Sequence, residues 1–532
     1  MRFSLVNKFI FRIVLCLIVV TVLMLFSVVR VADISLGSKT VNAASNGYTV
    51  ELNDGRGNIY DCNGIKLTGC EKLYAVIFLP CEEAMIKFVQ VTSGAQRENG
   101  LEKLRNKKPA VIERTSKLEG RGIYSFEIYK RYSEEYGAEH IIGYIDDSKK
   151  GITGLEKAFD DLLSETKNTE IFFPITASGE FLLGEQPEIK KNSSAGAVYL
   201  TLDSQIQKIC NIAADKLNKG AIVVTEIESG KIRGMVSKPG FDVYNLKKSV
   251  NDSNSPFINR VLSAFSVGSV FKPLIGAALL EEGLEDFSCK CNGYSDIGNI
   301  RFYCNKREGH GNMNFNKALT YSCNCYFYNA SSLITPDKFL NLASSLQFGA
   351  EINLADGIIT NKGIIPTVEQ LKNSKGAIAN FSIGQGNITL SPLVLCNLYS
   401  AIANGGFYYS PTLVEGYIQN EKYCKTLINE KKQVFSEKTA RILKEALINA
   451  VKTGTGKAAN PKQIGAGGKT ATAQTGQYNN GKEILNGWFC GFFPANEPKY
   501  VAVVLCEDAV SGGLNAAPIF KEIAEKIGDT VQ

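Results

Sequence analysis

Serine and lysine, rather than histidine, supply the candidate catalytic groups of this chain. The sequence has two histidines, His140 and His310, and neither lies beside a plausible nucleophile, so a Ser-His-Asp triad is not expected. A serine nucleophile without histidine needs another base, and a lysine three positions later is the recurring solution. Ser269-Val270-Phe271-Lys272 has this spacing. Because positions i and i+3 share one face of a helix, the Lys272 amine should reach the Ser269 hydroxyl.

The helix that carries this motif is expected to begin near Ser269. Pro273 and the apolar run Leu274 to Leu280 follow the motif, and proline is tolerated in a first helical turn but not further in. Lys272 must be neutral to accept a proton, which a desolvated site beside a second cation would favour. Ser164-Glu165-Thr166-Lys167 repeats the spacing, but we interpret it as a solvated polar stretch.

Downstream segments offer the other groups that such chemistry needs. Ser322-Cys323-Asn324 places a hydroxyl and an amide two residues apart, able to relay a proton and to hold a substrate amide. A basic residue on a strand is also expected, and three segments compete for this role. Lys438-Thr439-Ala440 lies inside the helical run Ser436 to Val451, and Lys452-Thr453-Gly454 lies where that helix ends.

The third segment, Gly467 to Gln474, is predicted to be the strand. Its small residues would let a peptide backbone approach closely. Lys469 and Thr470 on this strand would bind a terminal carboxylate. Lys469 is therefore preferred over Lys452 as the carboxylate-binding lysine.

Four other residues form a loose metal-ligand pattern. Cys289, Cys291, Cys304 and His310 lie close together in the sequence. The pattern lacks a paired Cys-x-x-Cys and is a weak zinc signal. A local disulfide or free thiols are favoured over a metal.

The N-terminus carries a long apolar segment. Ile13 to Val29 is uninterrupted, and Arg2, Lys8 and Arg12 precede it. Its length predicts a membrane helix over residues 13–32, and the positive-inside bias then leaves residues 1–12 in the cytoplasm and the rest outside. A cleaved signal peptide is the alternative. Its cleavage site, Val41-Asn42-Ala43, lies far from the apolar run, so a retained anchor is favoured.

The composition is that of a globular protein with more than one domain. The 532 residues are 44% apolar and 21% charged, and the net charge of +6 is dispersed rather than gathered in a basic stripe. These values predict two or three domains and argue against nucleic-acid binding. Residues 46–190 mix short strands, such as Tyr48 to Leu52 and Leu73 to Leu79, with polar turns, and show little helical periodicity. An irregular, extended module is expected there.

Residues 196–532 are expected to form a second domain. Strand-like runs occur near both of its ends, at 221–227, 232–236, 488–493 and 500–505, and helices are expected at 205–217 and 516–527. The stretch between the two β-rich ends has mostly helical periodicity. This order predicts one antiparallel sheet built from both ends of the domain, with a helical insertion.

Taken together, these motifs resemble the penicillin-binding and serine β-lactamase superfamily, specifically its class B transpeptidases. Family-like segments also occur at Arg56 to Gly64, Gly151 to Glu156, Thr201 to Gln207, Gly454 to Gly456 and Gly487 to Gly491. Two positions depart from the family pattern. Val267 stands where the family usually has proline, and Ala471 stands where it usually has glycine. Neither change removes a functional group.

The resemblance implies an α+β protein: a membrane helix, a β-rich pedestal or dimerisation module, and a transpeptidase domain with a five-stranded antiparallel sheet between helices. It implies that Ser269 attacks the penultimate D-Ala of a peptidoglycan stem peptide and that Lys272 is the general base. Ser322 and Asn324 would relay the proton and position the substrate.

The same resemblance also implies which residues bind the donor, the stem peptide that Ser269 attacks. Lys469 and Thr470 would hold the carboxylate, while the backbone N–H groups of Ser269 and Thr472 would form the oxyanion hole. No metal or organic cofactor is implied. The implied partners are stem peptides, β-lactams and a membrane glycan polymerase, with the segments around Arg56 and Gly151 as candidate contacts.

Two other functions remain open at this point. A β-lactamase or β-lactam sensor shares the three motifs, but the long N-terminal module and the single anchor argue against it. A non-catalytic scaffold of the wall-synthesis machinery is the stronger rival, because of Val267 and Ala471.

Overall fold

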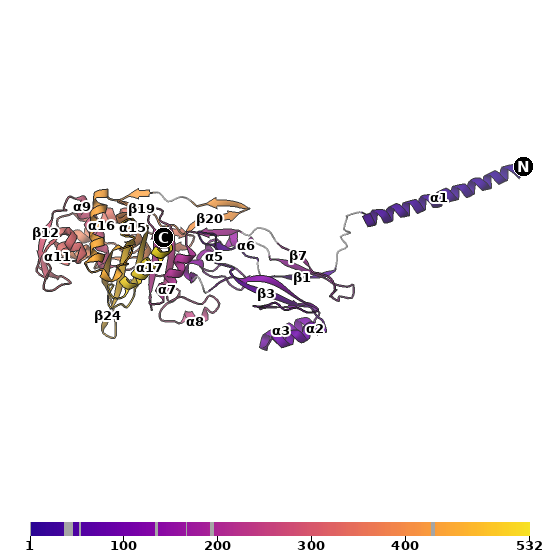
Figure 1. Ribbon diagram of the computed structural model, residues 1–532, viewed down its shortest axis with the longest axis horizontal. Helices are drawn as coiled ribbons and strands as arrows, with labels where there is room; N and C mark the ends of the chain where they lie inside the picture. Colours follow the sequence, from indigo (N-terminus) through magenta and orange to yellow (C-terminus); the bar gives the residue numbers. More distant parts are fainter. Residues whose placement is uncertain are drawn as a thin grey trace.

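The computed structural model describes residues 2–36, 46–52, 55–133, 137–165, 168–191, 196–426 and 431–531. Two segments named in the sequence analysis lie outside these residues. They are the alternative cleavage site Val41-Asn42-Ala43 and Thr166-Lys167, the end of the second Ser-x-x-Lys segment. Helix α1 (Arg2–Leu36) lies apart from the rest of the molecule (Figure 1). Within it, Ile10–Ala32 is long and apolar enough to cross a membrane, and none of its most apolar window is buried. The candidate span therefore begins three residues before the predicted 13–32.

The N-terminal module has two small sheets. In one, β1 (Gly47–Glu51), β6 (Glu170–Pro174) and β7 (Glu188–Lys190) pair in this order. In the other, β3 (Glu71–Phe78) lies between β4 (Ala110–Arg114) and β5 (Ile123–Lys130).

Two helices of the module were missed by the sequence analysis. These are α2 (Glu82–Val91) and α3 (Gly94–Arg105), and together with β3 they enclose a small apolar core. In α3 the buried positions are only Gly100 and Leu104. A helix that buries so few apolar side chains produces little hydrophobic periodicity, although it is stabilised by packing on the sheet.

The base of the module is joined to the C-terminal part by a four-stranded sheet. Strand β2 (Ile59–Tyr60) runs parallel to β8 (Ala197–Leu200), which pairs with β20 (Val414–Gln419) and, through it, with β21 (Lys422–Lys425). The apolar side chains of Ile59, Leu155 and Leu163 belong to the same core as Val198 and other apolar side chains of the C-terminal part. The module and the C-terminal part therefore share an apolar core at this junction.

A buried ion-pair network joins separate segments of the N-terminal module. Arg56 Nε donates to Glu156 Oε2 at 2.7 Å, Arg131 Nε donates to Glu156 Oε1 at 2.6 Å, and the Tyr132 hydroxyl donates to Glu156 Oε1 at 3.1 Å. Both Arg56 and Glu156 are buried. The segments that were candidate partner contacts thus bind each other, and these two side chains are not available to a partner.

The five-stranded antiparallel sheet predicted for the C-terminal part is confirmed. Its order is β10 (Ile232–Lys238), β9 (Gly220–Glu226), β25 (Tyr500–Cys506), β24 (Lys482–Phe493) and β23 (Gly467–Asn479). On one face pack α7 (Ser204–Ala214) and α17 (Ala516–Val531). On the other face lie α15 (Pro392–Ala403), α16 (Glu437–Lys452) and the turn η1 (Gly268–Phe271).

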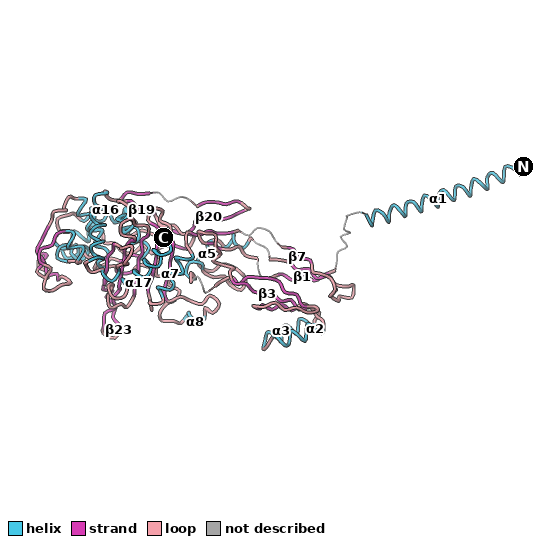
Figure 2. Tube along the Cα trace, in the orientation of Figure 1, coloured by secondary structure: helices cyan, strands magenta, loops and turns pink. Residues whose placement is uncertain are grey.

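The predicted helical insertion lies beyond this second face (Figure 2). Its helices are α9 (Lys272–Glu281), α10 (Phe315–Thr320), α11 (Asn324–Ser331), α12 (Pro336–Ser345), α13 (Val368–Lys372) and α14 (Lys375–Ser382). Two antiparallel strand pairs accompany them: β12 (Ser288–Cys291) with β15 (Gly311–Asn314), and β13 (Tyr294–Ile297) with β14 (Ile300–Tyr303).

The remaining elements are short. The helices are α4 (Glu139–Ile142), α5 (Gly154–Ala158), α6 (Asp160–Ser164), α8 (Lys247–Val250) and the turn η2 (Lys457–Ala459). The strand pairs are β11 (Phe265–Ser266) with β18 (Thr389–Leu390), β16 (Asn353–Ala355) with β17 (Ile358–Ile359), and β19 (Phe407–Tyr409) with β22 (Lys431–Gln433).

Candidate active site

The turn that carries Ser269 is held from several sides. The Gly268 N–H donates to Gly384 O at 2.9 Å, and the Tyr399 hydroxyl donates to Val270 O at 3.0 Å. The indole Nε1 of Trp488 donates to Ser266 O at 2.8 Å. Ser269 itself is half-buried, one residue into the 3₁₀ turn. Three hydrogen bonds to the backbone around Ser269 therefore fix its place beside the sheet.

Lys272 lies at the start of α9, one helical turn after Ser269, and it is fully buried. Its Nζ donates to Asn324 Oδ1 at 2.6 Å, to Ser322 O at 2.8 Å and to Ser322 Oγ at 3.1 Å. Burial lowers the pKa of Lys272 to about 8, because desolvation disfavours the charged amine. An amine with this pKa is partly neutral near neutral pH and can accept a proton.

Ser322 and Asn324 are brought to Lys272 by a sharp turn before α11. Ser322 has a φ of 59°, a left-handed conformation that is uncommon for residues other than glycine. The Cys323 N–H donates to Ala318 O at 2.9 Å, and helix α11 begins at Asn324. This turn points both side chains at the amine, although they lie about fifty residues further along the chain.

Strand β23 places Lys469 on the side of the sheet that faces Lys272. Lys469 is fully buried, and its Nζ donates to Thr470 O at 2.9 Å. Its pKa is held well below the usual range, first by burial and then by the positive charge of Lys272. The charge of Lys272 thus disfavours the charged form of Lys469, whereas the lowered pKa of Lys272 itself is caused by burial.

Thr470 and Thr472 of this strand contact other segments. Thr470 Oγ1 donates to Thr455 Oγ1 at 3.2 Å, and Thr472 Oγ1 accepts from the Gly512 N–H at 3.2 Å. Among the described strands, β23 pairs only with β24, so one of its edges is free. A free strand edge presents backbone donors and acceptors that an extended peptide can pair with.

The two departures from the family pattern are both buried. Val267 is fully buried directly before the turn, and Ala471 faces that turn from β23. Gly268 has a φ of 62°, and a Cβ built on it would lie 3.2 Å from Ala473 Cβ and 3.5 Å from Ala471 Cβ. The methyl group of Ala471 thus packs beneath the backbone that carries Ser269.

The lysines of the competing Lys-Thr segments lie on the surface. Lys438 is exposed on α16 and pairs with Glu285, and Lys452 is the exposed last residue of the same helix. Beyond that helix end, the Thr455 N–H donates to Thr320 O at 3.3 Å.

The cysteine cluster differs in one member from the predicted one. Cys291, Cys304 and His310 are joined by Cys323, whereas Cys289 is not part of the group. The fourteen cysteines are free thiols, so the local disulfide is not formed. Sequence spacing could not reveal Cys323, because it lies thirteen positions beyond His310 and is brought back by the turn before α11.

Comparison with known proteins finds a family model and close structural counterparts. The model of the penicillin-binding protein transpeptidase domain matches residues 220–525. Stage V sporulation protein D of Bacillus subtilis is 28% identical, covering 92% of this chain and 80% of that protein. The peptidoglycan D,D-transpeptidase MrdA of Acinetobacter baumannii is 26% identical over 73% of this chain and 60% of its own length. A solved structure of a peptidoglycan synthase complex has a TM-score of 0.71 at 21% identity, covering 96% of this chain and 97% of its own.

Proposed function

Since this chain belongs to the penicillin-binding protein transpeptidase family, as one of its class B members, we propose that it cross-links peptidoglycan stem peptides through an acyl-enzyme on Ser269. The observation that carries the proposal is the buried amine of Lys272, which lies one turn after Ser269 and is hydrogen-bonded to both Ser322 and Asn324. This arrangement supplies a nucleophile, a base and a proton relay without histidine.

In the first half-reaction, Ser269 Oγ attacks the carbonyl carbon of the penultimate D-Ala, and Lys272 takes the hydroxyl proton. The backbone N–H groups of Ser269 and Thr472 stabilise the oxyanion. The C–N bond to the terminal D-Ala then breaks, the leaving amine takes a proton through Ser322, and an ester on Ser269 remains. In the second half, an amine of a neighbouring stem peptide attacks the ester and releases Ser269.

Binding of the donor peptide uses β23. The free edge of β23 pairs with the extended peptide backbone. Lys469 and Thr470 hold the terminal carboxylate, and Asn324 orients the peptide amide. A β-lactam enters the same site and acylates Ser269.

The proposal extends to the arrangement of the whole chain. Ile10–Ala32 spans the membrane, the basic residues before it stay in the cytoplasm, and the catalytic part lies outside. Residues 46–190 form the non-catalytic pedestal, and 196–532 form the transpeptidase domain. A membrane glycan polymerase is its partner, a suggestion supported by the structural likeness to a complex that coordinates polymerization and crosslinking.

The test is release of D-Ala from a stem pentapeptide in the presence of an acceptor amine. The detergent-purified full chain should release D-Ala and form the cross-linked product, and Ser269→Ala should form neither. Product formation by Ser269→Ala at the wild-type rate would refute the assignment. Rapid hydrolysis of β-lactams with no cross-linked product would instead indicate a β-lactamase.

A further inference from the structure

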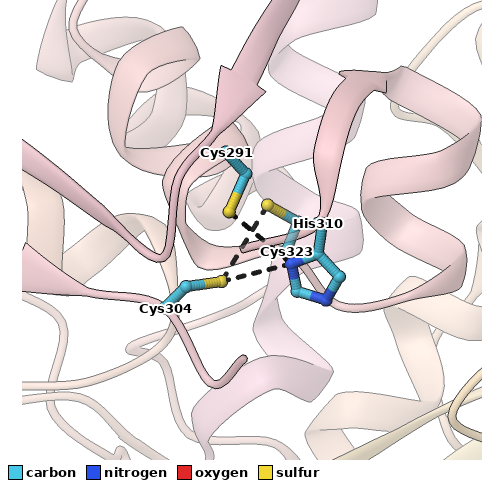
Figure 3. A group of neighbouring side chains, drawn as sticks. All are labelled: Cys291, Cys304, His310 and Cys323. Carbon is cyan, nitrogen blue, oxygen red and sulfur yellow. Dashed lines mark hydrogen bonds between the residues drawn. The ribbon is translucent and has the colours of Figure 1, made fainter. Parts of the chain in front are cut away.

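We propose that Cys291, Cys304, His310 and Cys323 form a structural zinc site that anchors the turn carrying Ser322 and Asn324. The four side chains converge from separate segments of the insertion (Figure 3). The three cysteines are buried and His310 is half-buried. Each contributes one ligand atom, and all four atoms lie within 4.8 Å of one another.

Three of the distances between these atoms are close to the edges of a tetrahedral site, and none of the others exceeds 4.8 Å. Zinc–sulfur bonds of about 2.3 Å and zinc–nitrogen bonds of about 2.0 Å set tetrahedral edges of about 3.8 Å between sulfurs and about 3.5 Å between sulfur and nitrogen. Here Cys304 Sγ lies 4.0 Å from Cys323 Sγ. His310 Nδ1 lies 3.6 Å from Cys291 Sγ and 3.4 Å from Cys304 Sγ. An ion could therefore be bound with little movement of the side chains.

The ligand types select zinc and argue against a disulfide. Disulfide sulfurs are about 2.05 Å apart, whereas the sulfurs of Cys304 and Cys323 are separated by 4.0 Å. Three thiols and one imidazole are soft and borderline ligands, a set that binds Zn²⁺ in structural sites. Because four protein ligands fill a tetrahedron, no position stays open for substrate, and the zinc would act by holding segments together.

The local backbone is shaped to bring His310 to the thiols. Gly309 and Gly311 flank it with φ values of 86° and 74°. A Cβ at Gly309 would lie 2.3 Å from Cys291 O, so only glycine allows this approach. Gly311 pairs with Cys291 across β12 and β15, and the Cys304 N–H donates to Gly293 O at 2.9 Å.

The fourth ligand couples this site to the proposed catalytic groups. Cys323 is the residue between Ser322 and Asn324 and directly precedes α11. A metal bond to its sulfur would tie the left-handed turn at Ser322 to the β12–β15 pair. Cys323 is thus a positioning residue, and this consequence for acylation rests on the proposed function, whereas the metal site itself does not.

The metal site is tested without reference to activity. The full chain, purified in detergent, should contain about one zinc per chain by elemental analysis. After exchange with Co²⁺ it should show the thiolate charge-transfer and d–d bands of a tetrahedral cobalt site. Cys304→Ser and His310→Ala should lose both signals. Cys289→Ser, an identical change on β12 outside the group, should keep them.

Two results would overturn the zinc site. One is a wild-type chain that binds no stoichiometric zinc and gives no cobalt bands. The other is equal metal loss in Cys289→Ser and Cys304→Ser. If Cys304→Ser fails to fold, Cys304→His decides, because it should keep one metal per chain while weakening the thiolate charge-transfer band.

The coupling to acylation has its own test. Removing zinc with a chelator should slow acylation by a fluorescent penicillin about 10- to 100-fold, as loss of groups that orient a site does, and Zn²⁺ but not Mg²⁺ should restore it. An unchanged rate in the zinc-free chain would overturn the positioning role. Ser269→Ala should keep its zinc, so a failure of the proposed function is distinguishable from a failure of the metal site.

Discussion

At the scale of residues, the account depends on which of two lysines, one buried and one exposed, binds the donor carboxylate. Lys469 is buried on β23, the edge strand of the sheet, and we propose that it binds the donor carboxylate. Lys452, in an apparently better Lys-Thr-Gly string, is exposed at the end of α16. The sequence distinguishes the two lysines only by their surroundings. Lys469 lies among small residues on a predicted strand, whereas Lys452 lies at the end of a predicted helix.

Lys469→Ala should therefore cripple acylation, whereas Lys452→Ala should leave it nearly unchanged. Loss of one preorganised charged contact costs about 2–4 kcal/mol in the transition state, which is a rate reduction of roughly 30- to 1,000-fold. The second-order rate constant for a fluorescent penicillin measures both variants. Equal losses in the two would contradict the assignment of the carboxylate-binding lysine.

The pH dependence of acylation reports on Lys272. Its pKa is lowered to about 8 by burial, and only the neutral amine accepts the Ser269 proton. Below this pKa the amine is protonated and inactive, so the rate should rise with pH through about 8 and then level off. Lys272→Arg, which stays protonated, should be inactive at every pH. If the acylation rate rose only near the unperturbed lysine pKa of about 10.4, Lys272 would not be the desolvated base.

At the scale of elements, the Glu156 network shows how the module is held together. One buried carboxylate accepts from Arg56 and from the adjacent residues Arg131 and Tyr132, so it joins two other segments to its own. The sequence analysis marked the segments of Arg56 and Glu156 as family-like and named the segments around Arg56 and Gly151 as candidate partner contacts. Their pairing could not be deduced, because they are a hundred residues apart.

Glu156→Gln should destabilise the protein strongly. Removing one partner from a buried ion pair costs about 3–5 kcal/mol. Here Arg131 would lose its carboxylate, and Arg56 would keep only its ion pair with Asp160 at 2.8 Å. Equilibrium urea unfolding of the full chain in detergent measures the change. Glu98→Gln, on the exposed surface of α3, is the matched control and should shift the midpoint little. Equal shifts for both variants would show that the network contributes no more than a surface charge.

Other elements differ in how well they could be foreseen. Strands β9, β10 and β25 were predicted to within two residues, whereas β24 begins six residues before the predicted 488–493. Helix α3 was not predicted because it buries few apolar side chains. Cys323 was not predicted as a ligand because a turn brings it to the other three residues, so the spacing in the sequence is not that of a known motif. Pairing between distant segments is decided by packing, which a single sequence does not display.

At the scale of the whole molecule, the pedestal and the catalytic half are not independent bodies at their junction. Ile59 and Leu155 of the module lie in the same core as Val198 and Val223, and β2 extends the sheet of β8 and β20. We therefore expect a chain without residues 46–190 to expose this core. It should aggregate or be digested by protease far faster than the full chain, and recovery of a soluble, protease-resistant protein would contradict the shared core.

The central claim is that Ser269 becomes acylated, and intact-protein mass spectrometry tests it most directly. After incubation with benzylpenicillin, the full chain should gain the mass of one ring-opened penicillin, and peptide mapping should place the adduct on the peptide that contains Ser269. Ser269→Ala should gain no mass. A wild-type chain that stays unmodified, or an adduct that persists in Ser269→Ala, would contradict the account.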